Sequence, residues 1–251
     1  LSLFLVLMLC TLAAAQNPPD TMYCGAFIRA VPPVPFNNEL MYSDRFGNLY
    51  THTELQESAF LATSHCNDIE DFNLNFVDNP LRPFTSEERE RVCDVFTYLS
   101  ALIERPAQGQ RATFTIRKGK MPREQLAQGG AFYPEQCGMG HSLVHRVLFT
   151  GDNFGDIDHG RITINVDETR FYTGADPAGI GSGEYDFQTM ILHEALHALG
   201  FASDIVPGGT GNGFYTLWDL NLRNVEGARL VEALPVNNLN CCLQYGINEA
   251  D

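Results

Sequence analysis

The chain has 251 residues, of which 44% are hydrophobic, 19% charged and 11% aromatic. This composition is that of a globular protein with one substantial domain, and it excludes a disordered chain, collagen-like repeats and a coiled coil. The 31 acidic and 16 basic residues give a formal net charge of −15. A surface this acidic repels phosphate backbones, so we do not expect nucleic acid as a partner.

The first fifteen residues resemble a signal peptide. Residues 3–12 are almost entirely apolar, and Ala13, Ala14 and Ala15 follow them. A short apolar stretch that ends in small residues is what signal peptidase cleaves. Because an initiator Met and a basic start are absent, we expect residues 1–15 to be an N-terminally incomplete signal peptide of a secreted, extracellular protein. No later apolar run is long enough to cross a bilayer, so we expect no membrane span.

Six cysteines follow the predicted signal peptide. They are Cys24, Cys66, Cys93, Cys137, Cys241 and Cys242. An even number in an exported chain predicts disulfide bonds, although the sequence does not choose among the possible pairings. No two cysteines have the CxxC spacing, so we do not expect a structural zinc bound by cysteines.

Two regions follow, with a boundary near residue 70. Residues 16–69 begin with a stretch rich in Pro and Asn, so we expect an extended lead-in or propeptide-like segment. Residues 70–251 then form the main domain. Within it, residues 70–77 alternate apolar with polar and predict a strand. Residues 119–140 are expected to be rich in loops.

A helix should begin at Thr85, whose hydroxyl can cap it, with Glu87 and Glu88 in the first turn. Apolar residues then recur at helical spacing up to Pro106. The alternating stretches 112–116 and 161–166 predict two further strands. A strand, a helix and more strands in this order predict an α/β or α+β sheet layered with helices.

The next predicted helix carries the candidate metal-binding and catalytic residues. Asp186 can cap it, residues 187–199 form it, and Gly200 follows where helices usually end. His193 and His197 are four residues apart and share one face of this helix, so both can bind one zinc ion. Glu194 lies beside the first histidine, where a carboxylate can act as general base on a zinc-activated water.

An HExxH pattern has only three fixed positions and also arises by chance. In that case His193 and His197 would be surface residues, or buried residues bonded to nearby carbonyl groups. The surrounding positions are apolar: Met190, Ile191, Leu192, Ala195, Leu196, Ala198 and Leu199. Burying two histidines and a glutamate here costs free energy unless they share a purpose, so we favour zinc.

The nine residues His193 to Phe201, HEALHALGF, resemble the metzincin zinc signature as far as its glycine. A compact metzincin signature has a third histidine where this chain has Ser203. In that respect the chain is similar to leishmanolysin-like metzincins and related secreted bacterial metallopeptidases, where an insertion separates the glycine from the third ligand. The resemblance covers residues 70 to 220, and the nine residues are its diagnostic part.

The resemblance implies an α+β, metzincin-like zincin fold. Such a fold has a mixed twisted sheet, a long N-terminal helix (here the one from Thr85) and an HExxH active-site helix. It also implies that the strand at residues 162–166 is the substrate-aligning edge strand. The implied activity is that of a secreted zinc metalloendopeptidase, a hydrolase of protein or peptide substrates. Its Zn²⁺ would be bound by His193 and His197, and Glu194 would be the catalytic residue.

The sequence does not identify the third zinc ligand. No histidine follows His197 and no methionine follows Met190, so neither a third histidine nor a Met-turn is present. We favour a catalytic domain that is truncated at its C-terminus, with the ligand beyond residue 251. The alternatives are Asp204 and Asp219, each of which also suits a cap or a surface turn.

A rival function keeps the fold without catalysis, as a secreted binding or adhesion module. The missing third ligand favours this rival, whereas Glu194 argues against it, because a non-catalytic zinc site does not need a general base. A zinc hydrolase of non-peptide amides is a further alternative.

Three lesser patterns receive structural interpretations. We expect His141 and His145 to be a solvated or hydrogen-bonded pair, not a second metal site. Asp152, Asp156 and Asp158 should form a polar turn, not a calcium site. Either Cys24 or Cys66 could cap the zinc in a latent form, but we favour disulfide bonds for both.

Overall fold

The structure is a computed structural model of the whole chain. It describes residues 41–44, 48–60, 63–66, 68–134, 138–203, 205, 214–233 and 245–247. The predicted signal peptide at residues 1–15 lies outside these residues, as do Cys24, Cys137, Cys241 and Cys242.

The described residues form a mixed α/β fold whose main helices are α2 (His52–Phe60), α3 (Ser86–Leu102) and α5 (Phe187–Ala198). The strands are β1 (Met41–Asp44), β2 (Leu49–Thr51), β3 (Thr63–His65), β4 (Phe72–Val77), β5 (Ala112–Gly119), β6 (Ala127–Tyr133), β7 (Gly138–Gly140), β8 (Gly160–Asn165), β9 (Phe171–Tyr172), β10 (Tyr185–Asp186), β11 (Phe214–Thr216), β12 (Val231–Ala233) and β13 (Tyr245–Ile247). The short elements are α4 (Leu143–His145), the π-helical turn Arg146–Thr150, and the 3-10 turns Pro177–Gly179 and Asp219–Asn221.

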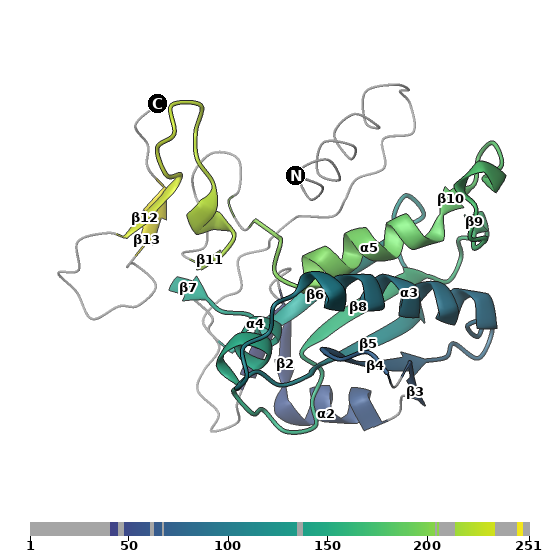
Figure 1. Cartoon of the computed structure of the whole chain (residues 1–251), viewed down its shortest axis with the longest axis horizontal. Helices are drawn as coiled ribbons and strands as arrows, with labels where there is room; N and C mark the ends of the chain where they lie inside the picture. The colour runs from purple at the N-terminus through teal and green to yellow at the C-terminus, as the bar shows by residue number, and fades with distance from the viewer. Residues whose placement is uncertain are drawn as a thin grey trace.

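Seven strands form one mixed sheet in the order β2-β1-β6-β8-β5-β4-β3. The three strands β4, β5 and β8 are parallel, while β6 runs antiparallel to β8. Helices α3 and α5 lie against one side of this sheet, and α2 lies on the opposite side (Figure 1). The predicted strands at 70–77, 112–116 and 161–166 and the helix from Thr85 are therefore confirmed.

The helix α3 begins where its capping residues predict. The Thr85 side chain accepts a hydrogen bond from the Glu88 N–H, and the Glu88 carboxylate accepts one from the Thr85 N–H. This capping box satisfies two N–H groups that the first turn leaves unpaired. The apolar stripe of α3 then faces the sheet, with Phe96 packed edge-on against Phe72 and Phe114. The start and inward face of α3 thus follow from local sequence.

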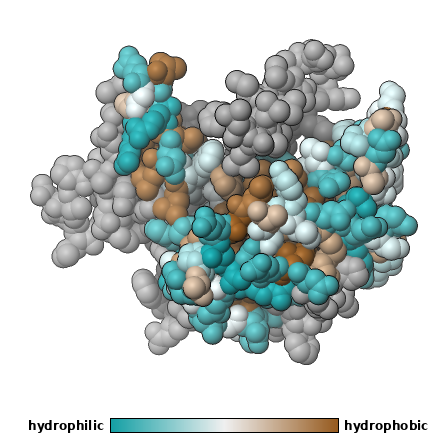
Figure 2. All heavy atoms as spheres, viewed as in Figure 1, coloured by the Kyte–Doolittle hydropathy of each residue, from teal (hydrophilic) through white to brown (hydrophobic). Residues whose placement is uncertain are grey.

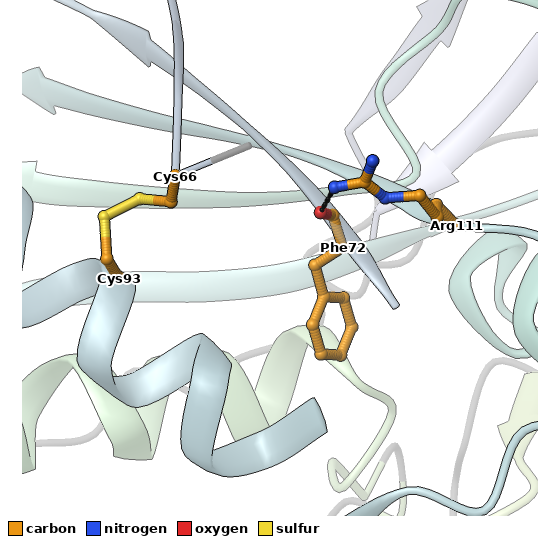
Figure 3. The surroundings of a disulfide bond; sticks show 4 residues. All are labelled: Cys66, Phe72, Cys93 and Arg111. Carbon is orange, nitrogen blue, oxygen red and sulfur yellow. Dashed lines mark hydrogen bonds between the residues drawn. A yellow bond between two sulfur atoms is a disulfide. The ribbon is translucent and has the colours of Figure 1, made fainter. Parts of the chain in front are cut away.

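A disulfide bond joins Cys66, after β3, to Cys93 in α3, with 5.8 Å between the Cα atoms. Figure 3 shows this bond tying α3 to the strand region, while Arg111 lies near the start of β4. The Arg111 guanidinium donates to the carbonyl oxygens of Ile69 and Phe72, both at 2.7 Å. One predicted disulfide is therefore present, and Cys66 is engaged in it.

Three expectations are corrected by the sheet. The region 119–140 was expected to be loop-rich but contains β6 and β7. Strand β6 was not predicted because Gly129 and Gly130 interrupt its apolar alternation. Residues 41–65 of the expected lead-in contribute β1, β2 and β3 to the sheet. The strand at 162–166 is not at an edge, because β8 lies between β5 and β6.

The apolar face of α5 also contributes to the hydrophobic core. Phe187, Ile191, Ala195 and Ala198 are fully buried. In the view of Figure 2, hydrophilic residues cover much of the described surface, and apolar residues are visible in the region of α5. In the described part of the chain, no helix has the length and apolar character needed to cross a membrane.

Candidate metal centre

Both ends of α5 are held by local hydrogen bonds. At its start, the Asp186 carboxylate accepts from the Thr189 N–H at 3.0 Å. At its end, Gly200 has a φ of +103°, a conformation that costs a residue with a Cβ but not glycine. The Gly200 N–H bonds to the His197 carbonyl and the Phe201 N–H to the Leu196 carbonyl, both at 3.0 Å. This is a Schellman motif, which turns the chain away directly after the second histidine.

The two histidines of α5 converge on one point. Their Nε2 atoms are 3.0 Å apart, and their rings are nearly perpendicular, with centroids 4.5 Å apart. Two nitrogens that bind one zinc at about 2.0–2.1 Å in a tetrahedral arrangement lie about 3.3 Å apart. The separation of His193 and His197 is close to that value, and it is also the length of a hydrogen bond between the two rings.

The tautomer of His197 follows from its second hydrogen bond. Its Nδ1 atom lies 2.9 Å from the carbonyl oxygen of Phe201. A carbonyl oxygen only accepts, so Nδ1 carries the proton, and the neutral ring presents the lone pair of Nε2 toward His193. Metal-binding histidines typically donate their other N–H to a carbonyl or carboxylate in this way. His193 and His197 could therefore supply two nitrogen donors to a divalent metal ion.

Glu194 projects from α5 toward β6. Its side chain is buried, and Oε2 accepts a hydrogen bond from the Gly129 N–H at 2.5 Å. A Cβ at Gly129 would lie only 2.0 Å from the Glu194 carbonyl oxygen. The absence of a side chain at Gly129 is therefore what allows α5 to lie directly on β6, with the carboxylate held by the strand.

The candidate third ligands are placed differently. Asp204 lies outside the described residues. Asp219 is fully buried, and its Oδ2 accepts hydrogen bonds from the N–H and the hydroxyl of Thr216 at 2.8 and 3.1 Å. Those bonds give Asp219 a turn-stabilising role. Within the described residues, no group of three or more His, Cys, Asp or Glu side chains could hold a metal ion.

The residues of the lesser patterns make the following contacts. The rings of His141 and His145 are in contact, with centroids 5.6 Å apart. Burial, and then the charge of His141, lowers the pKa of His145. Asp152 pairs with Arg146 at 2.6 Å, while Asp158 pairs with Arg161 at 3.2 Å. Asp152 and Asp158 thus have different partners.

Two groups of this centre were not predicted from the sequence. The Gly129 N–H and the Phe201 carbonyl are backbone groups, whose side chains carry no chemical signal. The glycine pair 129–130 was a usable sign, because glycine inside a strand often marks a close backbone approach. The position of Phe201, four residues after His197, was a second sign, since a chain that turns at Gly200 brings that carbonyl back over the helix end.

No protein-family model, curated protein or solved structure matches the chain.

Proposed function

We propose that the protein is a secreted, metzincin-like zinc endopeptidase that hydrolyses peptide bonds of protein or peptide substrates. The observation that carries this proposal is the convergence of the two Nε2 atoms of His193 and His197, 3.0 Å apart, on the helix that also presents the buried Glu194.

His193 and His197 would hold the zinc through their Nε2 atoms. The bound zinc would supply a Lewis acid that polarises a peptide carbonyl and lowers the pKa of water. The Phe201 carbonyl keeps the proton of His197 on Nδ1, so its Nε2 lone pair remains available to the metal. Among the described residues no third side chain completes a metal site, so the proposal assigns two protein ligands.

Glu194 would move the proton. Its carboxylate would accept a proton from the attacking water and deliver it to the leaving amine. The hydrogen bond from the Gly129 N–H fixes the orientation of this carboxylate through one oxygen. Because the side chain is buried, its interaction with a nearby charge is stronger than it would be in water.

The order of the elements supports a zincin-like arrangement. The parallel strands β4, β5 and β8 are followed by α5, and the antiparallel strand β6 lies next to β8 and beneath Glu194. In this arrangement β6, not β8, is the candidate for a strand that lies beside the substrate. Residues 127–131 of β6 pair with β8 on one side, and the described part of β1 pairs only with Phe132 and Tyr133 on the other.

The rival is a secreted binding module that retains this centre without catalysis. This rival is favoured because, among the described residues, no third metal-binding side chain joins His193 and His197. The buried Glu194, held in place by the backbone of β6, favours the peptidase.

The test measures zinc content and casein hydrolysis of the purified protein and its Glu194→Gln variant. We expect one zinc per chain in both proteins, and a loss of at least about 100-fold in activity when the general base is removed. His193→Ala and His197→Ala should each lose zinc. Failure of the wild-type protein to bind zinc would sink the proposal, while zinc binding with no hydrolysis would favour the rival.

A further inference from the structure

The side of the sheet that faces away from α3 and α5 contains a pocket. One part of this side is covered by the small apolar cluster of Tyr42, Leu55, Phe132, Leu143 and Ile157. Beside that cluster is a pocket of about 180 Å³ between β2, β5, β6 and β8. Its polar lining includes Arg117, Lys120, Gln128, Arg161 and Thr163.

The strand register explains why these side chains meet. On β6, Gly129 faces α5, so Gln128 and Gly130 face the other side of the sheet. Gly130 lies opposite Arg161 of β8, and Thr163 of β8 lies between Gln128 of β6 and Arg117 of β5. Three adjacent strands thus present neighbouring polar side chains to one place, and Gly130 leaves room between them.

The pocket is cationic in an acidic protein. Three of the 16 basic residues line it, although the formal net charge of the chain is −15. Arg161 is fixed at its wall by an ion pair with Asp158 at 3.2 Å and by stacking of its guanidinium over the rings of Tyr50 and Phe132. Its charge is therefore held at one position.

Arg117, on the neighbouring strand β5, lines the same pocket. Its Nε donates to the Thr163 hydroxyl at 3.1 Å. The Arg117 side chain is exposed at the pocket, and partial desolvation, and then the positive charge of Arg161, lowers its pKa. Among the described residues, Lys120 has no hydrogen bond or ion pair. Asp158 pairs with Arg161, and an anion in the pocket would relieve the repulsion between Arg117 and Arg161.

We propose that this pocket is an oxyanion-binding site for a small ligand that carries a phosphate or a carboxylate group. Guanidinium groups bind both kinds of oxyanion through paired, charge-assisted hydrogen bonds. The pocket is smaller than the roughly 300–1,000 Å³ typical of sites for larger ligands, which favours a small anion over a nucleotide. The site is on the opposite side of the sheet from His193 and is independent of zinc.

The test is a titration of the protein with inorganic phosphate, and separately with succinate, at constant ionic strength. Backbone amide signals of Gln128, Gly130 and Thr163 are followed by NMR. We expect saturable shifts with at least one of the two anions, and the one that binds identifies the source of the oxyanion. The double variant Arg117→Gln/Lys120→Gln should weaken this binding about tenfold or more, as the loss of charged hydrogen bonds predicts.

The matched control is Arg223→Gln/Arg229→Gln, which removes the same charge from two exposed positions. It should leave the affinity unchanged. Arg161 is kept in all variants because it packs on Tyr50 and Phe132. The proposal is overturned if neither anion shifts the pocket amides, or if the control weakens binding as much as the pocket variant.

Discussion

The backbone N–H of Gly129 donates a hydrogen bond to the carboxylate of Glu194, with 2.5 Å between N and Oε2. The bond joins strand β6 to helix α5 across 65 positions of the chain. The same glycine lets the two backbones touch, since a Cβ there would be 2.0 Å from the Glu194 carbonyl oxygen. Position 129 thus controls both the seating of the helix and the orientation of its carboxylate.

Gly129→Ala should therefore push α5 away from β6. We expect the free energy of unfolding to fall by about 1–3 kcal/mol, the usual cost of overpacking a core, with loss of any hydrolytic activity. Urea unfolding and casein hydrolysis measure the two effects. Gly119→Ala is the control, because its Cβ would meet only the Thr163 methyl group, at 3.0 Å. Equal stabilities of the two variants would contradict the proposed contact.

Gly200→Ala should weaken zinc binding. With a φ of +103°, alanine at this position is strained by about 1–2 kcal/mol and favours another turn. A different turn moves the Phe201 carbonyl away from His197 Nδ1, and loss of such a partner typically lowers metal affinity about 10- to 100-fold. Zinc titration checks this effect. Gly155→Ala, at φ +75° with open space around its Cβ, carries comparable strain and should retain zinc affinity.

His159 should make stability depend on pH. Burial lowers its pKa from 6.5 to about 4, and its Nδ1 accepts a hydrogen bond from the Thr113 N–H at 2.8 Å. Between pH 6.5 and 4 the unfolded chain therefore binds more protons than the folded protein. The free energy of unfolding should fall by roughly 3 kcal/mol as the pH is lowered through this window.

Urea unfolding of the wild type and of His159→Gln across this pH range checks the histidine effect. The carboxylates titrate in both proteins, so the difference between the two curves isolates His159. We expect the difference to change between pH 6.5 and 4 and to be constant below pH 4. Parallel curves would show that His159 is not the source.

Removal of the disulfide between Cys66 and Cys93 should destabilise the fold. The bond closes a loop with a sequence separation of 27, for which the chain-entropy relation gives about 3.5 kcal/mol. The double variant Cys66→Ala/Cys93→Ala should show this loss in urea unfolding. Because the other cysteines are unchanged, addition of a reductant to this variant measures their separate contribution. An unchanged midpoint in the variant would contradict a stabilising role for the bond.

The buried ion pair of Lys118 and Glu88 predicts a non-additive result. The Lys118 Nζ lies 2.6 and 2.8 Å from the two Glu88 oxygens, and both side chains are buried. Lys118→Met leaves a buried carboxylate without its cation and should cost about 3–5 kcal/mol. Adding Glu88→Gln should recover part of that loss, because the amide carries no charge. Thermal or urea unfolding of the single and double variants gives the coupling free energy, and simple additivity would contradict the pairing.

Elements with a strong local signal were predictable from the sequence. The capping box of Thr85 and Glu88, the alternation of β4, and the caps at the two ends of α5 each depend on residues a few positions apart in the chain. The convergence of His193 and His197 is of the same kind, since a spacing of four on a helix places two side chains on one face. The predictions of a signal peptide, of secretion and of peptidase activity remain predictions.

Elements defined by distant partners were not predictable. Strand β6 has a sequence interrupted by two glycines, and its pairing with β8 and β1 is what makes it a strand. The expectation that residues 162–166 form an edge failed for a related reason. Strand order depends on which segments pair across the whole chain, and alternation within one strand does not encode it.

The sequence by itself determined the helix that carries His193, Glu194 and His197, because helix caps and a four-residue spacing act through neighbouring residues. Only the tertiary structure decided what that helix rests on. Seating α5 on β6, bonding Glu194 to Gly129 and gathering Arg117 with Arg161 across the sheet all require segments that are far apart in the chain. Those contacts follow from packing and register, which are properties of the folded chain as a whole.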